Sequence, residues 1–345
     1  MARWILWASL GLAPLTIAID RLADAGDVAL FVLAAASLVP LAWLIGESTE
    51  HAAEHTGPGI GGFLNASFGN APELIIALLA VAQNLPVVVR GSLSGSVVSN
   101  LLLVYGVTQI AGPDRAPIDR RSLLAQVGLV GAAVLAFVAP VWLGASGDRD
   151  RHSLVVVSIP IAAVLLLAYL AVVGRNLLRH RHAELEEPEA SAWSLPVSLG
   201  VLAVATVATA LVSEILVHSL DAFAHAVGLS EFFIAVVIVA IVGNAAEHGG
   251  AIVIARAGKM KLATEIAISS SAQVGLLVAP AVMLLSLLFA HPLTLAFRPV
   301  ELIVMAGAVV LVAATVRDGH SRKWEGAVGV AAYAGAVGIY YAFGA

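Results

Sequence analysis

The 345-residue chain contains no cysteine, which excludes disulfide bonds and thiolate-based metal or redox sites. It also has little charge, because Asp, Glu, Lys and Arg make up 12% of the residues, about half the share found in a soluble domain. No basic patch is longer than a few residues, so nothing supports nucleic-acid binding. The net charge of −5 is small for this length and does not indicate a particular class of partner.

Hydrophobic residues fill 60% of the chain and the mean hydropathy is +0.96. The sequence therefore predicts an all-α polytopic membrane protein surrounded by the lipid bilayer, with no sizeable soluble domain. We read eleven transmembrane helices from the apolar runs and their polar interruptions. They span residues 3–19, 27–47, 58–84, 87–111, 122–145, 153–174, 193–217, 229–255, 262–290, 296–316 and 325–344. The first run lacks a convincing cleavage site, so we expect an uncleaved helix rather than a signal peptide.

The distribution of Lys and Arg predicts the orientation, because these residues are enriched in cytoplasmic loops. With the N-terminus in the cytoplasm, 13 of the 18 Lys and Arg residues lie on the cytoplasmic side. We therefore expect a cytoplasmic N-terminus and an external C-terminus. The same bias supports the number of spans, since one missed span would scramble the pattern downstream.

A short string occurs twice inside apolar segments. Residues 69–73 read Gly-Asn-Ala-Pro-Glu and residues 243–248 read Gly-Asn-Ala-Ala-Glu-His, so Asn-x-x-Glu recurs at an offset of 174 residues. The two strings lie five spans apart, in helices that cross in opposite directions. This indicates two inverted five-helix repeats, spans 2–6 and 7–11, plus an extra N-terminal helix. The expected division is 1–26 for the extra span, 27–178 for the first repeat, 179–192 for an acidic cytoplasmic linker helix and 193–345 for the second repeat.

The repeated string carries the chemistry of the chain. Asn70 and Glu73 are three residues apart, so in a helix they share one face, and Asn244 and Glu247 do the same. A carboxylate in a membrane helix is costly and by default marks an ion or substrate path. Two such carboxylates, each following an asparagine, predict one cation site built from two halves of a duplicated protein.

Further oxygen ligands surround the two motifs. Pro72 removes a backbone donor, which leaves the carbonyl oxygen of Phe68 free to face a cation. Residues 95–100 read Gly-Ser-Val-Val-Ser-Asn, and residues 269–274, at the same offset, read Ser-Ser-Ser-Ala-Gln-Val. Small residues in membrane helices usually serve packing, so these stretches alone favour packing. The pairing of the two Asn-x-x-Glu motifs is what favours a ligand role.

This oxygen-rich set suits a hard divalent cation such as Ca²⁺, which takes about six to eight oxygen ligands. Zn²⁺ is less natural, because there is no cysteine and only His248 is adjacent. Two carboxylates close together in a low-dielectric site do not easily both stay charged, so protons and the cation should compete for them. That competition is a physical basis for cation/proton exchange, and His248 beside Glu247 is suited to tune or relay the proton.

Two other segments have competing interpretations. The linker contains four glutamates and is either a solvated helix that separates two bundles or a cation-sensing, regulatory segment; these residues are Glu184, Glu186, Glu187 and Glu189. Residues 51–55 read His-Ala-Ala-Glu-His and match the H-x-x-E-H zinc-peptidase pattern. No third ligand follows in a plausible context, so we favour a polar cytoplasmic mouth and expect no enzyme activity.

On these residues, the chain resembles the cation/proton exchanger family of the calcium/cation antiporter superfamily over nearly its full length. Residues 61–73 resemble the first repeat signature of that family, and residues 241–248 resemble the second, which is very specific. Residues 95–104 look like the helix that follows the first signature, and Ser270 with Gln273 look like its counterpart. The resemblance implies export of Ca²⁺ against H⁺, without a cofactor, by an integral protein of the bacterial inner (plasma) membrane.

The resemblance also implies roles for particular residues. Glu73 and Glu247 would be the central ligands and would also carry the protons. The side chains that would line the site are Asn70, Asn244, Ser96, Asn100, Ser270 and Gln273. Two further carboxylates, Glu50 and Glu214, match residues that flank the path on spans 2 and 7, although one lies 20 residues before its asparagine and the other 30. The linker glutamates would supply the acidic helix between the halves.

Ser269 stands where the family often has glycine, and His51 where glutamine is common, which puts the fine selectivity in doubt. Two alternative functions remain, a sodium-coupled exchanger of the same superfamily and a passive divalent-cation channel. Sodium-coupled relatives usually carry hydroxyl residues where Asn70 and Asn244 stand, which favours proton coupling. Mn²⁺ or other divalent cations would fit the same oxygens, and a homo-oligomer is compatible with the sequence.

Overall fold

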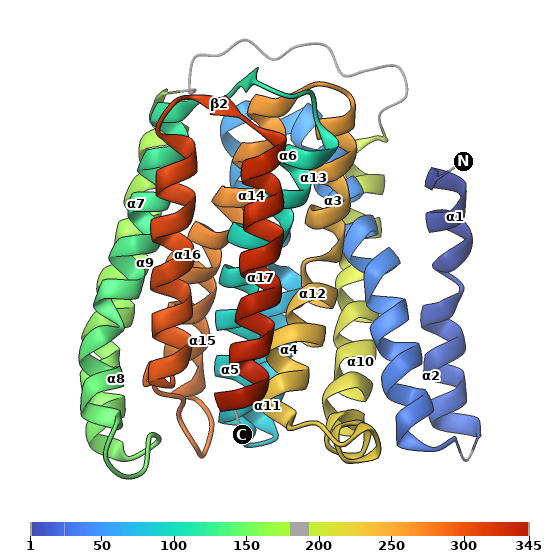
Figure 1. Cartoon of the computed structure of the whole chain (residues 1–345). Helices are drawn as coiled ribbons and strands as arrows, with labels where there is room; N and C mark the ends of the chain where they lie inside the picture. The colour runs from blue at the N-terminus through green and yellow to red at the C-terminus, as the bar shows by residue number, and fades with distance from the viewer. Residues whose placement is uncertain (1, 24, 180–192, 344–345) are drawn as a thin grey trace. The chain divides into compact units, whose positions relative to one another are not determined.

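The computed structural model describes residues 2–23, 25–179 and 193–343, and helices form almost all of this part (Figure 1). The α-helices are α1 (Ala2–Ser9), α2 (Leu12–Leu22), α3 (Asp27–Phe68), α4 (Ala71–Ala82), α5 (Pro86–Val98), α6 (Tyr105–Ala111), α7 (Arg120–Ala136), α8 (Val138–Gly144), α9 (His152–Arg179), α10 (Leu195–Val227), α11 (Glu231–Phe233), α12 (Ala240–Gly243), α13 (Ala245–Arg256), α14 (Met260–Gln273), α15 (Ala279–Ser286), α16 (Pro299–Val316) and α17 (Lys323–Phe343). Three segments are π-helical, namely η1 (Ser99–Val104), η2 (Ile234–Val239) and η3 (Val274–Val278). One antiparallel ladder pairs β1 (Ala116–Pro117) with β2 (His320–Ser321).

The chain forms two compact units, each assembled from separate stretches of sequence. The first unit contains Met1–Leu79, Leu167–Leu229 and Val242–Ala246. Within it, α3 packs along α10, and α2 packs against both. Phe31 of α3 stacks on Phe223 of α10 with ring centroids 4.2 Å apart, and the hydroxyls of Thr16 and Ser37 lie 2.9 Å apart. Aromatic stacking and a buried hydroxyl pair thus join α3 to both neighbours.

The second unit contains Ala80–Leu166, Ser230–Ile241 and Glu247–Ala345. At its centre, α5, η1 and α6 follow one another, and residues 88–98 are all buried. A Cβ atom on Gly95 would overlap the carbonyl oxygen of Val236 in η2, and one on Gly106 would lie 2.7 Å from the carbonyl oxygen of Gly326 in α17. Small residues therefore let these helices cross at close range, as is common between membrane helices.

Nine helices among the described residues are long and apolar enough to cross a membrane, and the bent segment from Glu231 to Arg256 supplies a tenth. The expected span at 58–84 is the one that does not form a separate long helix. Instead, α3 continues without interruption to Phe68, and only the short apolar helix α4 follows. The polar stretch after residue 47 does not end α3, because polar side chains alone do not remove the backbone hydrogen bonds that hold a helix.

The 174-residue offset of the sequence also relates backbone elements. α4 and α13 begin 174 positions apart and end 174 positions apart, at residues 71 and 245 and at residues 82 and 256. α5 and α14 begin at this offset, as do α6 and α15. The turns after α4 and α13 each contain one residue with positive φ, Asn84 (58°) and Gly258 (81°), again 174 positions apart. The two halves therefore share a local backbone pattern over several consecutive elements.

The predicted direction of each repeat across the bilayer, and the division into 1–26, 27–178, 179–192 and 193–345, stay predictions. The all-helical membrane architecture itself agrees with the sequence, and most predicted spans coincide with observed helices within a few residues. The β1–β2 ladder was not expected. It joins the loop after α6 to the loop after α16 through only two residues from each side.

Candidate functional site

The first Asn-x-x-Glu motif lies at a break between two helices. α3 ends at Phe68 and α4 begins at Ala71, so Asn70 occupies the break and Glu73 lies in the first turn of α4. The backbone N–H of Leu74 donates to the carbonyl of Asn70 at 3.1 Å, which closes that first turn. Pro72, the second residue of α4, explains the break, because its ring cannot be accommodated in a helix that continues from the preceding turn. Asn70 is 1% exposed and Glu73 is 7% exposed.

The second motif has the same arrangement. α12 ends at Gly243, α13 begins at Ala245, and the chain bends by 56° at the break. Asn244 lies in the break and is buried, and Glu247 lies in the first turn of α13. Both glutamates are therefore at helix N-termini, where backbone N–H groups and the positive end of the helix dipole favour negative charge. The sequence predicted that Asn and Glu share one helix face; the structure instead puts each asparagine in the break before its helix.

Two parts of the motifs meet inside the first unit. A Cβ atom on Gly243 would lie 3.4 Å from Cγ and 3.6 Å from Cδ of Glu73. The side chain of Glu73 therefore passes over the glycine that precedes Asn244. A Cβ atom at position 243 would thus be in ordinary van der Waals contact with the Glu73 side chain.

Four predicted residues form a hydrogen-bonded chain inside the second unit. His248 Nε2 lies 2.8 Å from Oδ1 of Asn100, and Nδ2 of Asn100 donates to Oγ of Ser270 at 2.9 Å. The Ser270 side chain hydrogen-bonds to Glu247. Because the Asn100 amide presents Oδ1 to His248, Nε2 must carry the hydrogen, and the Ser270 hydroxyl is left to donate to the carboxylate. The remaining Glu247 oxygen, Oε2, is buried and makes no hydrogen bond to the described residues.

The other predicted ligands lie on the same pair of helices. Ser96 is buried on α5, and Gln273 is the last residue of α14 and is half-buried. The hydroxyl of Ser271 donates to the carbonyl of Val97 at 3.2 Å and so links α14 to α5. The packing interpretation holds for Gly95, whose missing Cβ admits η2. Asn100 and Ser270, in contrast, hydrogen-bond to each other and to other predicted site residues.

The predicted flanking carboxylates lie on exposed surfaces of the first unit. Glu50 is exposed on α3. Glu214 is exposed on α10 and lines a cavity of about 250 Å³ together with Asp20, Arg21 and His218. The four linker residues Glu184, Glu186, Glu187 and Glu189 lie outside the described residues.

The histidines of the H-x-x-E-H pattern have other partners. His51 lies 3.6 Å from Glu47 and 3.6 Å from Glu54, and its ring centroid is 4.6 Å from that of Trp193. His55 Nε2 is 2.6 Å from the carbonyl oxygen of Trp193. Within the described ranges, no three His, Asp or Glu side chains are grouped so that they would hold a metal ion. The pattern here ties α3 to the segment that enters α10.

Sequence reasoning missed two buried carboxylates in the second unit. Glu301 is 0% exposed and accepts hydrogen bonds from Ser94 (2.6 Å) and from the backbone N–H of Arg298 (2.6 Å). Glu325 is 6% exposed, 3.9 Å from Arg322. Both lie in predicted spans, so the rule that singled out Glu73 would also have found them. Glu301 has a structural role, because it caps α16.

Comparison with known proteins places this geometry among ion exchangers. A model described as sodium/calcium exchanger protein matches residues 27–178 and 197–342. The chain is 40% identical over 316 residues to the Ca(2+)/H(+) antiporter ChaA of Bacillus subtilis (strain 168), covering 88% of this chain and 89% of the relative. It is 34% identical over 316 residues to the vacuolar calcium ion transporter of Schizosaccharomyces pombe, covering 88% of this chain and 77% of the relative.

Two solved structures are also similar to this chain. The structure of native YfkE matches with a TM-score of 0.84 at 35% identity and covers 99% of both chains. The sodium-calcium exchanger NCX_Mj matches with a TM-score of 0.60 at 19% identity over 90% of this chain and 98% of that chain, a likeness of fold alone.

Proposed function

The chain belongs to the sodium/calcium exchanger protein family, and we propose that it is a secondary antiporter that exchanges Ca²⁺ for H⁺. Relatives that are 33 to 40% identical to it carry the names Ca(2+)/H(+) antiporter and vacuolar cation/proton exchanger. Such a protein is a transporter rather than an enzyme, and Ca²⁺ and H⁺ are its substrates.

The observation that carries the proposal is the matched pair of Asn-x-x-Glu motifs. Each motif sets an asparagine in a helix break and a glutamate in the next helical turn. Interrupted membrane helices from two repeats commonly form the ion site of a transporter near the bilayer midplane. We propose that Glu73 and Glu247 are the central Ca²⁺ ligands. The remaining ligands would come from Asn70, Asn244, Ser96, Asn100, Ser270 and Gln273.

The same carboxylates would carry the protons. Either a cation or protons can neutralise them, so occupancy by one expels the other. His248 is hydrogen-bonded through Asn100 and Ser270 towards Glu247, which supports a proton-coupling role. In this mechanism the two repeats are inverted and move relative to each other, so that the site opens to one side of the membrane at a time. The stoichiometry must exceed two protons per Ca²⁺ for the membrane potential to assist export.

The remaining predictions fit this role. The N-terminus would be cytoplasmic and the C-terminus external, in the bacterial inner (plasma) membrane. Glu50 and Glu214 would attract cations towards the site, and the acidic linker would sense or regulate. The exposure of Glu50 and Glu214 on the first unit is compatible with contact with cations in solution.

The direct test uses purified protein in liposomes loaded with a pH-sensitive dye. A Ca²⁺ gradient is imposed without sodium, and the internal pH is followed. We expect protons to move opposite to Ca²⁺ in the wild type and not in Glu73→Gln. Ca²⁺ movement without a pH change would contradict the proposal and would indicate a channel or another counter-ion.

The sodium-coupled alternative is tested in the same liposomes. A sodium gradient replaces the proton gradient, and Ca²⁺ uptake is measured at equal pH on both sides. Uptake driven by sodium would favour that alternative.

A further inference from the structure

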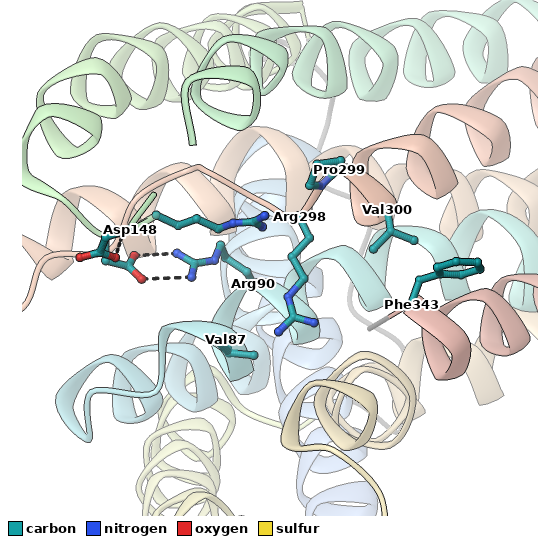
Figure 2. A pocket seen from close by; sticks show the side chains of 9 residues that line it. Val87, Arg90, Asp148, Arg298, Pro299, Val300 and Phe343 are labelled. Atoms are coloured by element: carbon teal, nitrogen blue, oxygen red, sulfur yellow. Dashed lines mark hydrogen bonds and ion pairs between the residues drawn. The ribbon is translucent and has the colours of Figure 1, made fainter. Parts of the chain in front are cut away.

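A second polar region of the second unit lies away from the residues of the proposed cation site. It is a cavity of about 540 Å³ whose charged lining consists of Arg90, Asp148, Arg149, Asp150 and Arg298 (Figure 2). Arg90 comes from the second turn of α5, Asp148 to Asp150 from the loop between α8 and α9, and Arg298 from the residue before α16. Three separate stretches of chain therefore bring three arginines to one cavity.

The cavity lies at the ends of four membrane-capable helices. The membrane segments Pro86–Ala111, His152–Arg175 and Pro299–Val316 begin next to it, and Lys323–Phe343 ends in it. Helix ends of this kind lie near the boundary between hydrocarbon and water. The cavity is therefore at the level where lipid headgroups are found.

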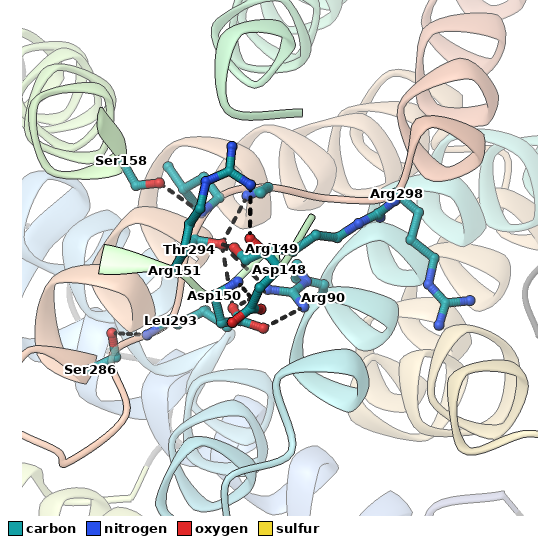
Figure 3. A network of polar contacts seen from close by, with 12 residues as sticks. Arg90, Asp148, Arg149, Asp150, Arg151, Ser158, Ser286, Leu293, Thr294 and Arg298 are labelled. Carbon is teal, nitrogen blue, oxygen red and sulfur yellow. Dashed lines mark hydrogen bonds and ion pairs between the residues drawn. The ribbon is translucent and has the colours of Figure 1, made fainter. Parts of the chain in front are cut away.

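Hydrogen bonds hold the walls of the cavity in place (Figure 3). Arg90 is 4% exposed and pairs with both carboxylate oxygens of Asp150, at 2.7 and 3.1 Å. Thr294 Oγ1 donates to the carbonyl of Arg149 at 2.6 Å, and the hydroxyl of Ser158 accepts from Leu295 N at 3.0 Å. The loop before α9 and the loop before α16 are thereby fixed to each other and to α5.

The lining of the cavity contains more arginines than aspartates. Arg90 and Asp150 form one ion pair, and the other charged residues of the lining are Arg149, Arg298 and the exposed Asp148. Arg149 has a buried Nη1 atom with no hydrogen-bond partner among the described residues. The Arg298 guanidinium lies 4.4 Å above the ring of Phe232. Burial lowers the pKa of Arg298; the Glu301 carboxylate opposes this, and nearby Arg149 and Arg90 add to it. The lining thus carries three arginines and two aspartates, with the Glu301 carboxylate near Arg298, and the buried Nη1 of Arg149 can still donate to a ligand.

The rest of the lining is apolar. Val87, Pro299, Val300 and Phe343 complete the cavity, and Phe343 is 71% exposed. In Figure 2, Val300 and Phe343 lie on the side of Arg298 away from Asp148. A ligand with an anionic head and a hydrocarbon body would match both parts of this lining.

We propose that this cavity binds a phosphate group, supplied by the headgroup of an anionic phospholipid. Guanidinium groups bind phosphate oxygens through two parallel hydrogen bonds, which suits Arg149 and Arg298. Basic pockets between membrane helices bind anionic headgroups on the cytoplasmic side of membranes, and the same guanidinium–phosphate chemistry is available at this end of the helices. The apolar residues beside the arginines receive the start of the acyl chains, which a free phosphate ion lacks. Bound lipid would join the ends of α5, α16 and α17 and stabilise the second unit.

The experiment uses the purified full chain in detergent after delipidation. Phosphatidylglycerol, phosphatidylcholine or inorganic phosphate is titrated in, and lipid retention by native mass spectrometry and the unfolding temperature are recorded. The variants are Arg149→Gln and Arg298→Gln, and the control is Arg21→Gln, which removes an exposed arginine outside the cavity. We expect phosphatidylglycerol to bind the wild type and raise its unfolding temperature, and each cavity variant to bind it about fivefold more weakly.

The arms distinguish the sources of the phosphate. The unfolding temperature rising with phosphatidylglycerol alone supports a lipid headgroup, provided that the rise is lost in the cavity variants and kept in Arg21→Gln. If inorganic phosphate raises the unfolding temperature as much as phosphatidylglycerol does, and the cavity variants lose this rise, the cavity recognises phosphate as a free ion and the lipid assignment is overturned. Equal retention of phosphatidylglycerol and phosphatidylcholine by the wild type overturns the proposal, and this comparison holds even if a variant fails to fold. Unchanged phosphatidylglycerol binding in both folded cavity variants also overturns it.

Discussion

At the scale of single residues, the two motif glutamates have the clearest expected phenotype. Glu73→Gln and Glu247→Gln keep the shape of the side chain but remove the charge that Ca²⁺ and protons would share. We expect either change to abolish Ca²⁺-driven proton movement in liposomes. The control is Asp221→Asn, which neutralises an exposed carboxylate of α10 outside the proposed site and path and should retain most of the activity. Exchange at wild-type rates in a correctly inserted Glu73→Gln or Glu247→Gln protein would exclude that residue as an essential ligand.

Asn100 gives a second prediction at this scale. Asn100→Leu leaves His248 and Ser270 buried without the amide that now joins them. Loss of a buried hydrogen-bond partner costs about 1–3 kcal/mol, so the unfolding temperature in detergent should fall. Ser99→Ala serves as the control, because the Ser99 hydroxyl bonds only to the carbonyl of Ser96 within its own helix. An unchanged unfolding temperature for Asn100→Leu would show that this chain of hydrogen bonds contributes nothing to stability.

The candidate residues were predictable from sequence to the extent that their chemistry is unusual in an apolar segment. Glu73 and Glu247 stand out because a carboxylate in a membrane helix has few structural uses. The link from His248 to Asn100 was not predictable, because the two residues are 148 positions apart and no local pattern joins them. The capping role of Glu301 was not predictable either, because its hydrogen bonds to Ser94 and to the backbone of Arg298 depend on the fold.

At the scale of elements, close packing of α5 against η2 makes Gly95 sensitive to substitution. A Cβ atom there would overlap the carbonyl oxygen of Val236. We expect Gly95→Ala to destabilise the protein by about 1–3 kcal/mol, as overpacking does in other cores. Gly128→Ala is the matched control, since that helical glycine has no atoms within 4 Å of the added Cβ. Thermal unfolding of both variants tests this; equal stability would mean that α5 and η2 separate without cost.

Helix boundaries were predictable where proline or a change in polarity marks them. Spans such as 87–111 and 325–344 correspond closely to observed helices. The continuity of α3 was not predictable, because a polar stretch looks the same in a loop and in a partly solvated helix. The break before Pro72 has a local cause, whereas the break at Asn244 occurs without proline. No local residue marks that second break, so it could be placed only through the 174-residue offset.

At the scale of the whole molecule, the predicted orientation is open to a clean test, because the chain has no native cysteine. Single cysteines can replace Ser146, exposed in the loop after α8, and His320, exposed in β2; the two segments are predicted to face opposite sides of the membrane. We expect a membrane-impermeant maleimide added to intact cells to label Ser146→Cys and not His320→Cys. Permeabilised cells provide the control in which both react. Labelling of His320→Cys alone in intact cells would reverse the predicted topology.

The composition of the two units was beyond sequence reasoning. The repeats were predicted as contiguous halves, but residues 230–241 belong to the same compact unit as residues 80–166. Hydrophobicity identifies which segments enter the membrane and does not encode which of them pack together, since every apolar face is satisfied by lipid as well as by protein. Close glycine contacts such as Gly106 with Gly326 supply that information only once the fold is known.

The chain from His248 through Asn100 and Ser270 to Glu247 has a polarity, because each member donates to the next. If protonated Glu247 donates to Ser270 and the serine hydroxyl in turn donates to Asn100, the amide has to rotate by 180°. Nδ2 of Asn100 then donates to Nε2 of His248, and the imidazole hydrogen is carried on Nδ1. In that arrangement, the protonation state of Glu247 determines the tautomer of the neighbouring His248. Nitrogen NMR of His248 would read that state without any flux being measured.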